Sequence, residues 1–214
     1  MTGILIAFVI ALLVPLFVSK WRTSLLGLTF QGALLAAIAH RQHGFDVSAG
    51  TAVIVADLVV VRTMVMPAWL FSTLKAENAP RSNDVIAPNL FSWAIALALV
   101  VVAFRTADVL VPVEGTEQSL VAVAAAAFLL GLFVLATARS IVSQVIGLMR
   151  VENAIALFEL GTPSENVSLS IRIAQAAIML VSVAFCRWYL IGLSREPVGS
   201  LPPPVPMGEE TADL

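Results

Sequence analysis

Seven apolar segments, each long enough to cross a lipid bilayer, constrain this chain more than any other feature. A transmembrane helix needs about 20 predominantly apolar residues, and 214 residues hold seven of them without room for a soluble catalytic domain. Charged residues make up only 12% of the chain, about half the share of a soluble domain. The sequence therefore predicts an all-α integral membrane protein of about seven transmembrane helices. The segments cover about 2–19, 23–40, 50–73, 88–111, 119–138, 141–160 and 168–193.

Basic residues are divided unequally between the connections. If the spans alternate sides, one set of connections holds six basic residues, and the other holds Arg41 with four acidic residues. Lysine and arginine concentrate in cytoplasmic connections, so we expect the N-terminus outside and the C-terminus in the cytoplasm. Because Lys20 and Arg22 follow the first apolar segment, we interpret that segment as a retained helix and not as a signal peptide. The six are Lys20, Arg22, Lys75, Arg81, Arg139 and Arg195, and the four are Asp46, Glu114, Glu117 and Glu165.

The C-terminal residues 196–214 differ in composition from the rest of the chain. They are rich in proline and end in an acidic stretch that includes Glu209 and Glu210. Such a segment cannot bury enough apolar area to fold alone, so we predict a disordered, polyproline-like cytoplasmic tail. A strap that docks onto a partner is the alternative.

The chain offers little material for a cofactor or a metal. Cys186 is its single cysteine, which excludes a disulfide framework and an all-cysteine metal site within one chain. His40 and His43 are three residues apart, so a metal or haem site on a helix is conceivable, but we favour solvation at the membrane edge. No basic cluster suggests a nucleic-acid partner. We predict no cofactor and no metal site.

Ionisable residues within the spans need an explanation, because each costs about 2.5–3.5 kcal/mol at the bilayer centre. Glu152 lies near the middle of its span, and Arg150, two residues earlier, points to a different helix face. Glu152 therefore either exchanges protons in a relay or stays neutral and pins the packing of helices. The candidates for proton transfer are Glu152, Arg150, Asp57, Arg62, Gln175 and Glu159.

The third segment carries a second polar feature. Asp57 and Arg62 are five residues apart, about 140° around an α-helix, so we expect direct pairing between them to be awkward. Pro67 removes a backbone hydrogen bond and can bend the helix. Glu159 lies close to the turn that begins at Gly161, and solvation by water can explain its charge. We detect no internal repeat.

The stretch from Arg139 to Leu160 resembles hydrogenase-4 component E of the formate hydrogenlyase group. In that family a Gln-x-x-Gly element leads into a Met-Glu-Asn-Gly core, matched here by Gln144, Gly147 and residues 151–154 (Val-Glu-Asn-Ala). The third helix is similar too, with a basic residue five positions before a proline, as Arg62 precedes Pro67. The seven-helix plan and the length also agree.

The resemblance implies a place within a larger machine. The family's last three helices look like the K subunit of respiratory complex I, which implies a four-helix region at 1–112 and a K-like region at 113–195. It also implies a location in the bacterial inner membrane, antiporter-like membrane subunits as partners, and catalysis in partner subunits. The family pattern puts a second acid near Gln175, where this chain has none.

We therefore expect a non-catalytic membrane subunit of a complex I-like assembly, such as a group 4 hydrogenase or formate hydrogenlyase. It would link antiporter-like subunits and contribute to proton or cation translocation. Two alternatives stay open: an independent small membrane transporter, and a purely structural assembly subunit with a neutral Glu152.

Overall fold

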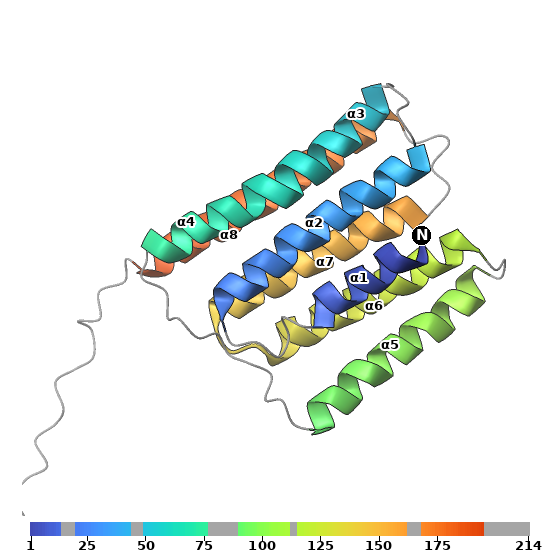
Figure 1. Cartoon of the computed structure of the whole chain (residues 1–214). Coiled ribbons are helices and arrows are strands. Elements are labelled where there is room, and N and C mark those ends of the chain that lie inside the picture. The colour runs from blue at the N-terminus through green and yellow to red at the C-terminus, as the bar shows by residue number, and fades with distance from the viewer. Residues whose placement is uncertain (14–19, 44–48, 77–89, 112–114, 162–167, 195–214) are drawn as a thin grey trace, which may run out of the picture.

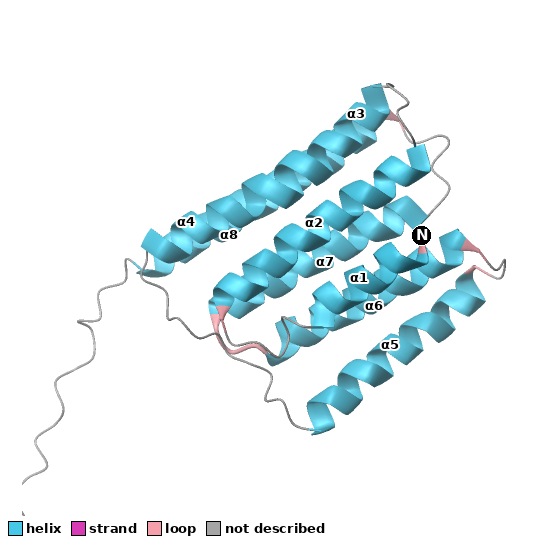
Figure 2. Ribbon diagram, viewed as in Figure 1, coloured by secondary structure: helices cyan, strands magenta, loops and turns pink. Residues whose placement is uncertain are grey.

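The computed structural model describes residues 1–13, 20–43, 49–76, 90–111, 115–161 and 168–194. Within these ranges every regular element is a helix, which confirms the all-α prediction (Figure 2). The elements are α1 (Thr2–Leu13), α2 (Trp21–His43), α3 (Ala49–Val55), the π-helix η2 (Ala56–Val65), α4 (Met66–Ala76), α5 (Leu90–Leu110), α6 (Thr116–Thr137), α7 (Ile141–Gly161) and α8 (Leu169–Ser194).

These helices agree closely with the seven predicted spans. Six helical stretches are long and apolar enough to cross a membrane, and α3, η2 and α4 together form one of them. α1 is apolar but shorter, and residues 14–19 lie outside the described part. The junction between α6 and α7 occurs at 138–140, where the sequence placed it. The protein is a multi-pass helical membrane protein.

The helices form two layers of three (Figure 1). α1, α2 and the continuous α3–η2–α4 rod make the first layer, and α6, α7 and α8 make the second. Across the layers α1 packs on α6, α2 on α7, and α3 and α4 on α8. Each of these pairs runs in the same direction. One group of polar side chains, from η2, α2 and α7, lies where the layers meet.

The two layers also correspond along the chain, although the sequence shows no repeat. α2 and α3 begin at Trp21 and Ala49, and their counterparts α7 and α8 begin at Ile141 and Leu169, 120 residues later in each case. Helix order and chain direction are therefore the same in both layers. Structure preserves a correspondence that apolar sequence does not reveal, because many apolar residues can fill the same helix face.

α5 is an edge helix that packs on α6 (Figure 1). The side chains it buries are all small: Ser92, Ala96, Ala103 and Ala107. Small residues let helix backbones approach closely in a membrane, where dispersion contacts replace the hydrophobic effect as the main attraction. The other faces of α5 are exposed and largely apolar, as a lipid-facing helix requires.

α6 and α7 approach each other closely at three glycines, Gly131, Gly147 and Gly161. A Cβ atom at Gly131 would lie 2.8 Å from Val151 Cγ2, and one at Gly147 would lie 3.1 Å from Val134 Cγ1. These contacts fix α7, and with it Glu152, against the second layer. Gln144, which contributes to the family resemblance, donates a hydrogen bond to the Ala138 carbonyl at 3.2 Å and so closes the junction between the two helices.

The chain begins at one end of the bundle, and α8 ends at the other (Figure 1). Lys20, Arg22, Lys75 and Arg139 lie at the end where α2 and α7 begin, whereas Arg41 lies at the opposite end. This separation follows the pattern from which the orientation was predicted. Outside the described residues lie Arg81, Arg195, Asp46, Glu114, Glu165 and the predicted tail at 196–214.

Candidate functional site

The middle of the third span is a π-helix of ten residues, Ala56–Val65. Its wider turn shows in the bond from the Met66 N–H to the Val61 carbonyl, five residues back. Pro67 follows immediately and has no N–H to offer to the carbonyl four residues before it. The widened turn precedes the proline, and the α3–η2–α4 rod continues without a sharp bend (Figure 1). Extended π-helices are rare and occur frequently at functional sites.

The π-helix corrects our prediction for Asp57 and Arg62. Arg62 Nε donates to Asp57 Oδ2 at 2.8 Å, in a direct ion pair that is almost completely buried. The expected angle of 140° assumed α-helical geometry. In a π-helix, residues five apart lie on the same face, because the backbone hydrogen bond itself spans five residues. The local backbone therefore creates the pair.

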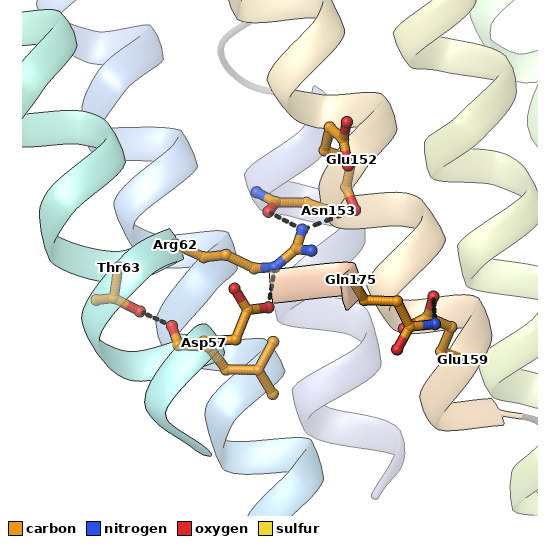
Figure 3. Close-up of polar contacts among 8 residues, drawn as sticks. Asp57, Arg62, Thr63, Glu152, Asn153, Glu159 and Gln175 are labelled. Carbon is orange, nitrogen blue, oxygen red and sulfur yellow. Dashed lines mark hydrogen bonds and ion pairs between the residues drawn. The ribbon is translucent and has the colours of Figure 1, made fainter. Parts of the chain in front are cut away.

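Arg62 also connects the two layers. Its Nη1 donates to the Glu152 carbonyl at 2.8 Å and to Asn153 Oδ1 at 3.3 Å, both on α7 (Figure 3). Asn153 Nδ2 then donates to Gln31 Oε1 on α2 at 3.4 Å, and Gln31 Nε2 donates to the Ala11 carbonyl on α1 at 3.1 Å. We call Asp57, Arg62, Asn153 and Gln31 the Arg62 junction. It joins four helical elements inside the membrane-spanning part.

A close approach of α2 to η2 brings the residues of this junction together. A Cβ atom at Gly32 on α2 would lie 2.8 Å from Thr63 Oγ1 and 3.0 Å from the Arg62 backbone carbon. Thr63 Oγ1 donates to the Leu58 carbonyl at 2.8 Å within η2 (Figure 3). The glycine therefore brings α2 against the π-helix at the level of Arg62.

A second polar group lies between α7 and α8. Ser182 Oγ donates to Glu152 Oε1 at 3.4 Å, and Gln175 Nε2 donates to Glu159 Oε1 at 2.7 Å. Figure 3 shows Gln175 and Glu159 pointing toward each other. We call these four residues the α7–α8 groove. All four are partly exposed, unlike the buried Arg62 and Asn153.

The groove has a regular geometry. Glu152 and Glu159 are seven residues apart on one face of α7, and Gln175 and Ser182 are seven apart on α8. Because the two helices are antiparallel, each acid meets its partner at a separate level. Seven residues of α-helix span about 10.5 Å. Two acids therefore occupy successive depths in the membrane.

Charged groups on three elements act on these acids. The two carboxyl groups interact electrostatically with each other. Glu159 also interacts with Arg62 and Asp57 of η2 and with Arg172 near the start of α8. The Arg62 junction therefore contributes to the electric field in the groove, although its side chains point elsewhere.

Arg150 lies outside both polar groups. Its side chain is 3% exposed, and its Nε has no hydrogen-bond partner. It shares a helix stripe with Gly147, which faces α6, and with Asn153, which faces α2. As predicted, no ion pair joins Arg150 to Glu152 in the described part of the chain.

Three features of this site were not predicted from the sequence: the residues Gln31 and Ser182, and the role of Asn153 in linking helices. Gln31 was the available signal, since an amide in the middle of an apolar span requires a partner. Asn153 was noticed only within the family motif. In structure, it bridges α7 to α2 and to η2.

Among the described residues, no group of three histidine, cysteine or acidic side chains is arranged to hold a metal ion. His40 is exposed near the end of α2, and the His43 side chain lies outside the described part. Comparison with known protein families, curated proteins and solved structures found no match to this chain. The resemblance to hydrogenase-4 component E therefore stays a prediction from the sequence.

Proposed function

We propose that this protein is a non-catalytic membrane subunit of a complex I-like assembly, such as a group 4 hydrogenase or formate hydrogenlyase. In this role it links antiporter-like subunits in a bacterial inner membrane, with its C-terminus in the cytoplasm. It contributes to proton or cation translocation and leaves redox chemistry to partner subunits.

One observation carries the proposal: Glu152 and Glu159 occupy two levels of the same face of α7, each beside a polar group of α8. A proton relay needs groups that both take up and release protons, placed at successive depths in the membrane. Glutamate does this when its surroundings favour neither form strongly. Ser182 offers Glu152 a long, weak hydrogen bond that survives either protonation state of the acid.

Glu159 supports the proposal at the position where the family resemblance leaves a gap. The resemblance implies an acid near Gln175 in the last helix, but glutamine cannot release a proton at physiological pH. The Gln175 amide contacts the Glu159 carboxyl of α7 directly. In our proposal, Glu159 therefore supplies the second acid from the neighbouring helix. Arg62 and Asp57, whose charges are opposite, lie beside the relay and act electrostatically on Glu159.

The test is proton translocation by the intact complex, measured in inverted membrane vesicles with the single substitution Glu152→Gln. We expect translocation per assembled complex to fall several-fold, because glutamine preserves shape and hydrogen bonding but cannot ionise. Glu117→Gln, at an exposed site in the first turn of α6, is the matched control and retains full translocation. Unchanged translocation in Glu152→Gln would make Glu152 a structural residue.

An independent small transporter is the second candidate, and the matched layers favour it. Many transporters are built from internal structural repeats and bind substrates at the repeat interface. Copurification separates the two proposals. An isolated monomer or homodimer that transports a solute in liposomes would replace the complex-subunit proposal.

A purely structural subunit is the third candidate, and the Arg62 junction favours it. That junction consists of side chains whose hydrogen bonds tie helices together. In such a subunit Glu152 stays neutral, and the complex translocates protons equally well with and without the substitution Glu152→Gln.

A further inference from the structure

Among the described elements, no helix packs on the outer face of the second layer. α6, α7 and α8 repeat the order and direction of α1, α2 and the α3–η2–α4 rod (Figure 1). A shift without rotation therefore relates the layers, so the face of the first layer that contacts α6–α8 corresponds to the outer face of α6–α8. Head-to-tail contacts of this kind do not close on themselves. The corresponding outer face is left open for a further layer of helices.

That outer face includes the α7–α8 groove. Ile155 of α7 lies between the two acids along the helix and is 42% exposed. Ile178 and Phe185 of α8, each 60% exposed, flank the groove on the other side. Glu152 and Glu159 are partly exposed between these apolar flanks. Contact with lipid is favourable for the isoleucine side chains. For an ionised carboxyl group, the same contact costs about 2.5–3.5 kcal/mol at mid-membrane.

Among the described residues, Arg62, Arg150 and Arg172 form no ion pair with Glu152. Arg62 points into the junction between the layers, where it binds Asp57 and the Glu152 backbone carbonyl. Arg150 is buried on the stripe of α7 that faces α6 and α2, and Arg172 interacts with Glu159. In the described part of the chain, the Glu152 carboxyl receives a hydrogen bond from Ser182 and no ion pair. The surface is therefore acidic at its centre and apolar at its flanks.

We propose that the outer face of α6–α8 docks a second membrane subunit, which presents a basic side chain to Glu152 in the α7–α8 groove from a membrane-spanning helix. This inference rests on the proposed function, because it assumes a larger membrane assembly. Two observations select this occupant: the head-to-tail stacking of layers within the chain, and the partly exposed Glu152, for which the described residues provide no ion pair. A lysine or arginine alone at mid-membrane would cost about as much free energy as the acid does. An ion pair between the two would lower the cost of both.

The test is site-specific photo-crosslinking in the native membrane. The photoreactive amino acid p-benzoylphenylalanine replaces Ile155 in one variant and Val101 in the other. Val101 is the control, because it is 52% exposed on the edge helix α5. We expect position 155 to attach to a membrane-spanning peptide of another subunit with Lys or Arg within its span, as identified by mass spectrometry. We expect position 101 to attach to lipid.

A second substitution tests the charge. Adding Glu152→Gln to the position-155 variant should reduce the protein adduct several-fold, whereas adding Glu117→Gln should leave it unchanged. Attachment of position 155 to lipid alone, to a second copy of this chain, or to a peptide without a basic residue in its span would overturn the proposal. If position 155 gives one of these results but translocation still falls in Glu152→Gln, the docking proposal is wrong and the proposed function stands. If position 155 gives the expected adduct but translocation is normal in Glu152→Gln, the proposed function is wrong and the docking proposal stands.

Discussion

The Arg62 junction and the α7–α8 groove lie side by side on α7 but treat their polar groups differently. In the junction, Arg62 is 4% exposed and donates to three acceptors on two elements. In the groove, Glu152 is partly exposed and accepts a bond of 3.4 Å from Ser182. Residues 152 and 153 are neighbours in the chain, so a single helix turn carries both a locked site and a loosely held one.

This difference suggests a division of labour. Buried polar groups with several partners hold helices in one arrangement, and breaking such a group is costly. A group held by a weak hydrogen bond costs little to alter, and it can change its protonation without moving the helices. The junction therefore holds the frame, and the groove carries the exchangeable protons.

Arg62→Leu should have the largest effect on stability. The substitution leaves Asp57 buried without its cation, and removing one partner of a buried ion pair costs about 3–5 kcal/mol. Thermal unfolding in detergent measures the loss. The double substitution Asp57→Leu with Arg62→Leu removes both charges and should recover a large part of it. If Arg62→Leu is as stable as the original protein, the junction does not hold the helices together.

Gly32→Ala should come next, because the new methyl group would meet Thr63 Oγ1 at 2.8 Å and the Arg62 backbone at 3.0 Å. Forcing extra volume into a packed contact costs about 1–3 kcal/mol. Gly192→Ala in α8 is the control, since nothing lies within 4 Å of a Cβ atom there. Equal unfolding temperatures for the two variants would show that α2 and η2 can separate at this level without cost.

Asn153→Ala should cost about 1–3 kcal/mol, because it removes a partner from both Arg62 and the buried Gln31. Gln144→Ala, which removes one exposed hydrogen bond to the Ala138 carbonyl, should have a smaller effect. Chemical unfolding of both variants in the same detergent gives the comparison. A larger loss in Gln144→Ala would move the centre of stability to the α6–α7 turn.

Ser182→Ala should have the smallest effect on stability, about 0.5 kcal/mol, because its bond to Glu152 is long. Its effect should appear in the rate of proton translocation by the intact complex instead. A large loss of stability would mean that the groove is locked like the junction.

Sequence patterns predicted the spans well because apolar length and loop charge are local properties. The α6–α7 boundary at 138–140 needed only Arg139 and Ser140 to be recognised as a polar break. The Asp57–Arg62 pair could not be predicted in the same way. Its prediction used the α-helical rotation per residue, and the local π-helix replaces that rotation.

The partners of the site residues depend on tertiary packing. Gln31 meets Asn153 across 122 positions of the chain, and Arg62 meets it across 91. No local sequence pattern predicts contacts between residues so far apart in the chain, because these contacts follow from how the two layers stack. The sequence could say that Glu152 needs a partner, but the choice of Ser182 follows from the antiparallel register of α7 and α8.

Infrared spectroscopy of the purified protein during a pH titration tests most directly whether the groove, and not the junction, exchanges protons. We expect a carboxylic-acid band that appears and disappears reversibly with pH, is lost in Glu152→Gln, and persists in Glu117→Gln. A spectrum in which no titrating band depends on Glu152, over the whole pH range in which the protein stays folded, would contradict it.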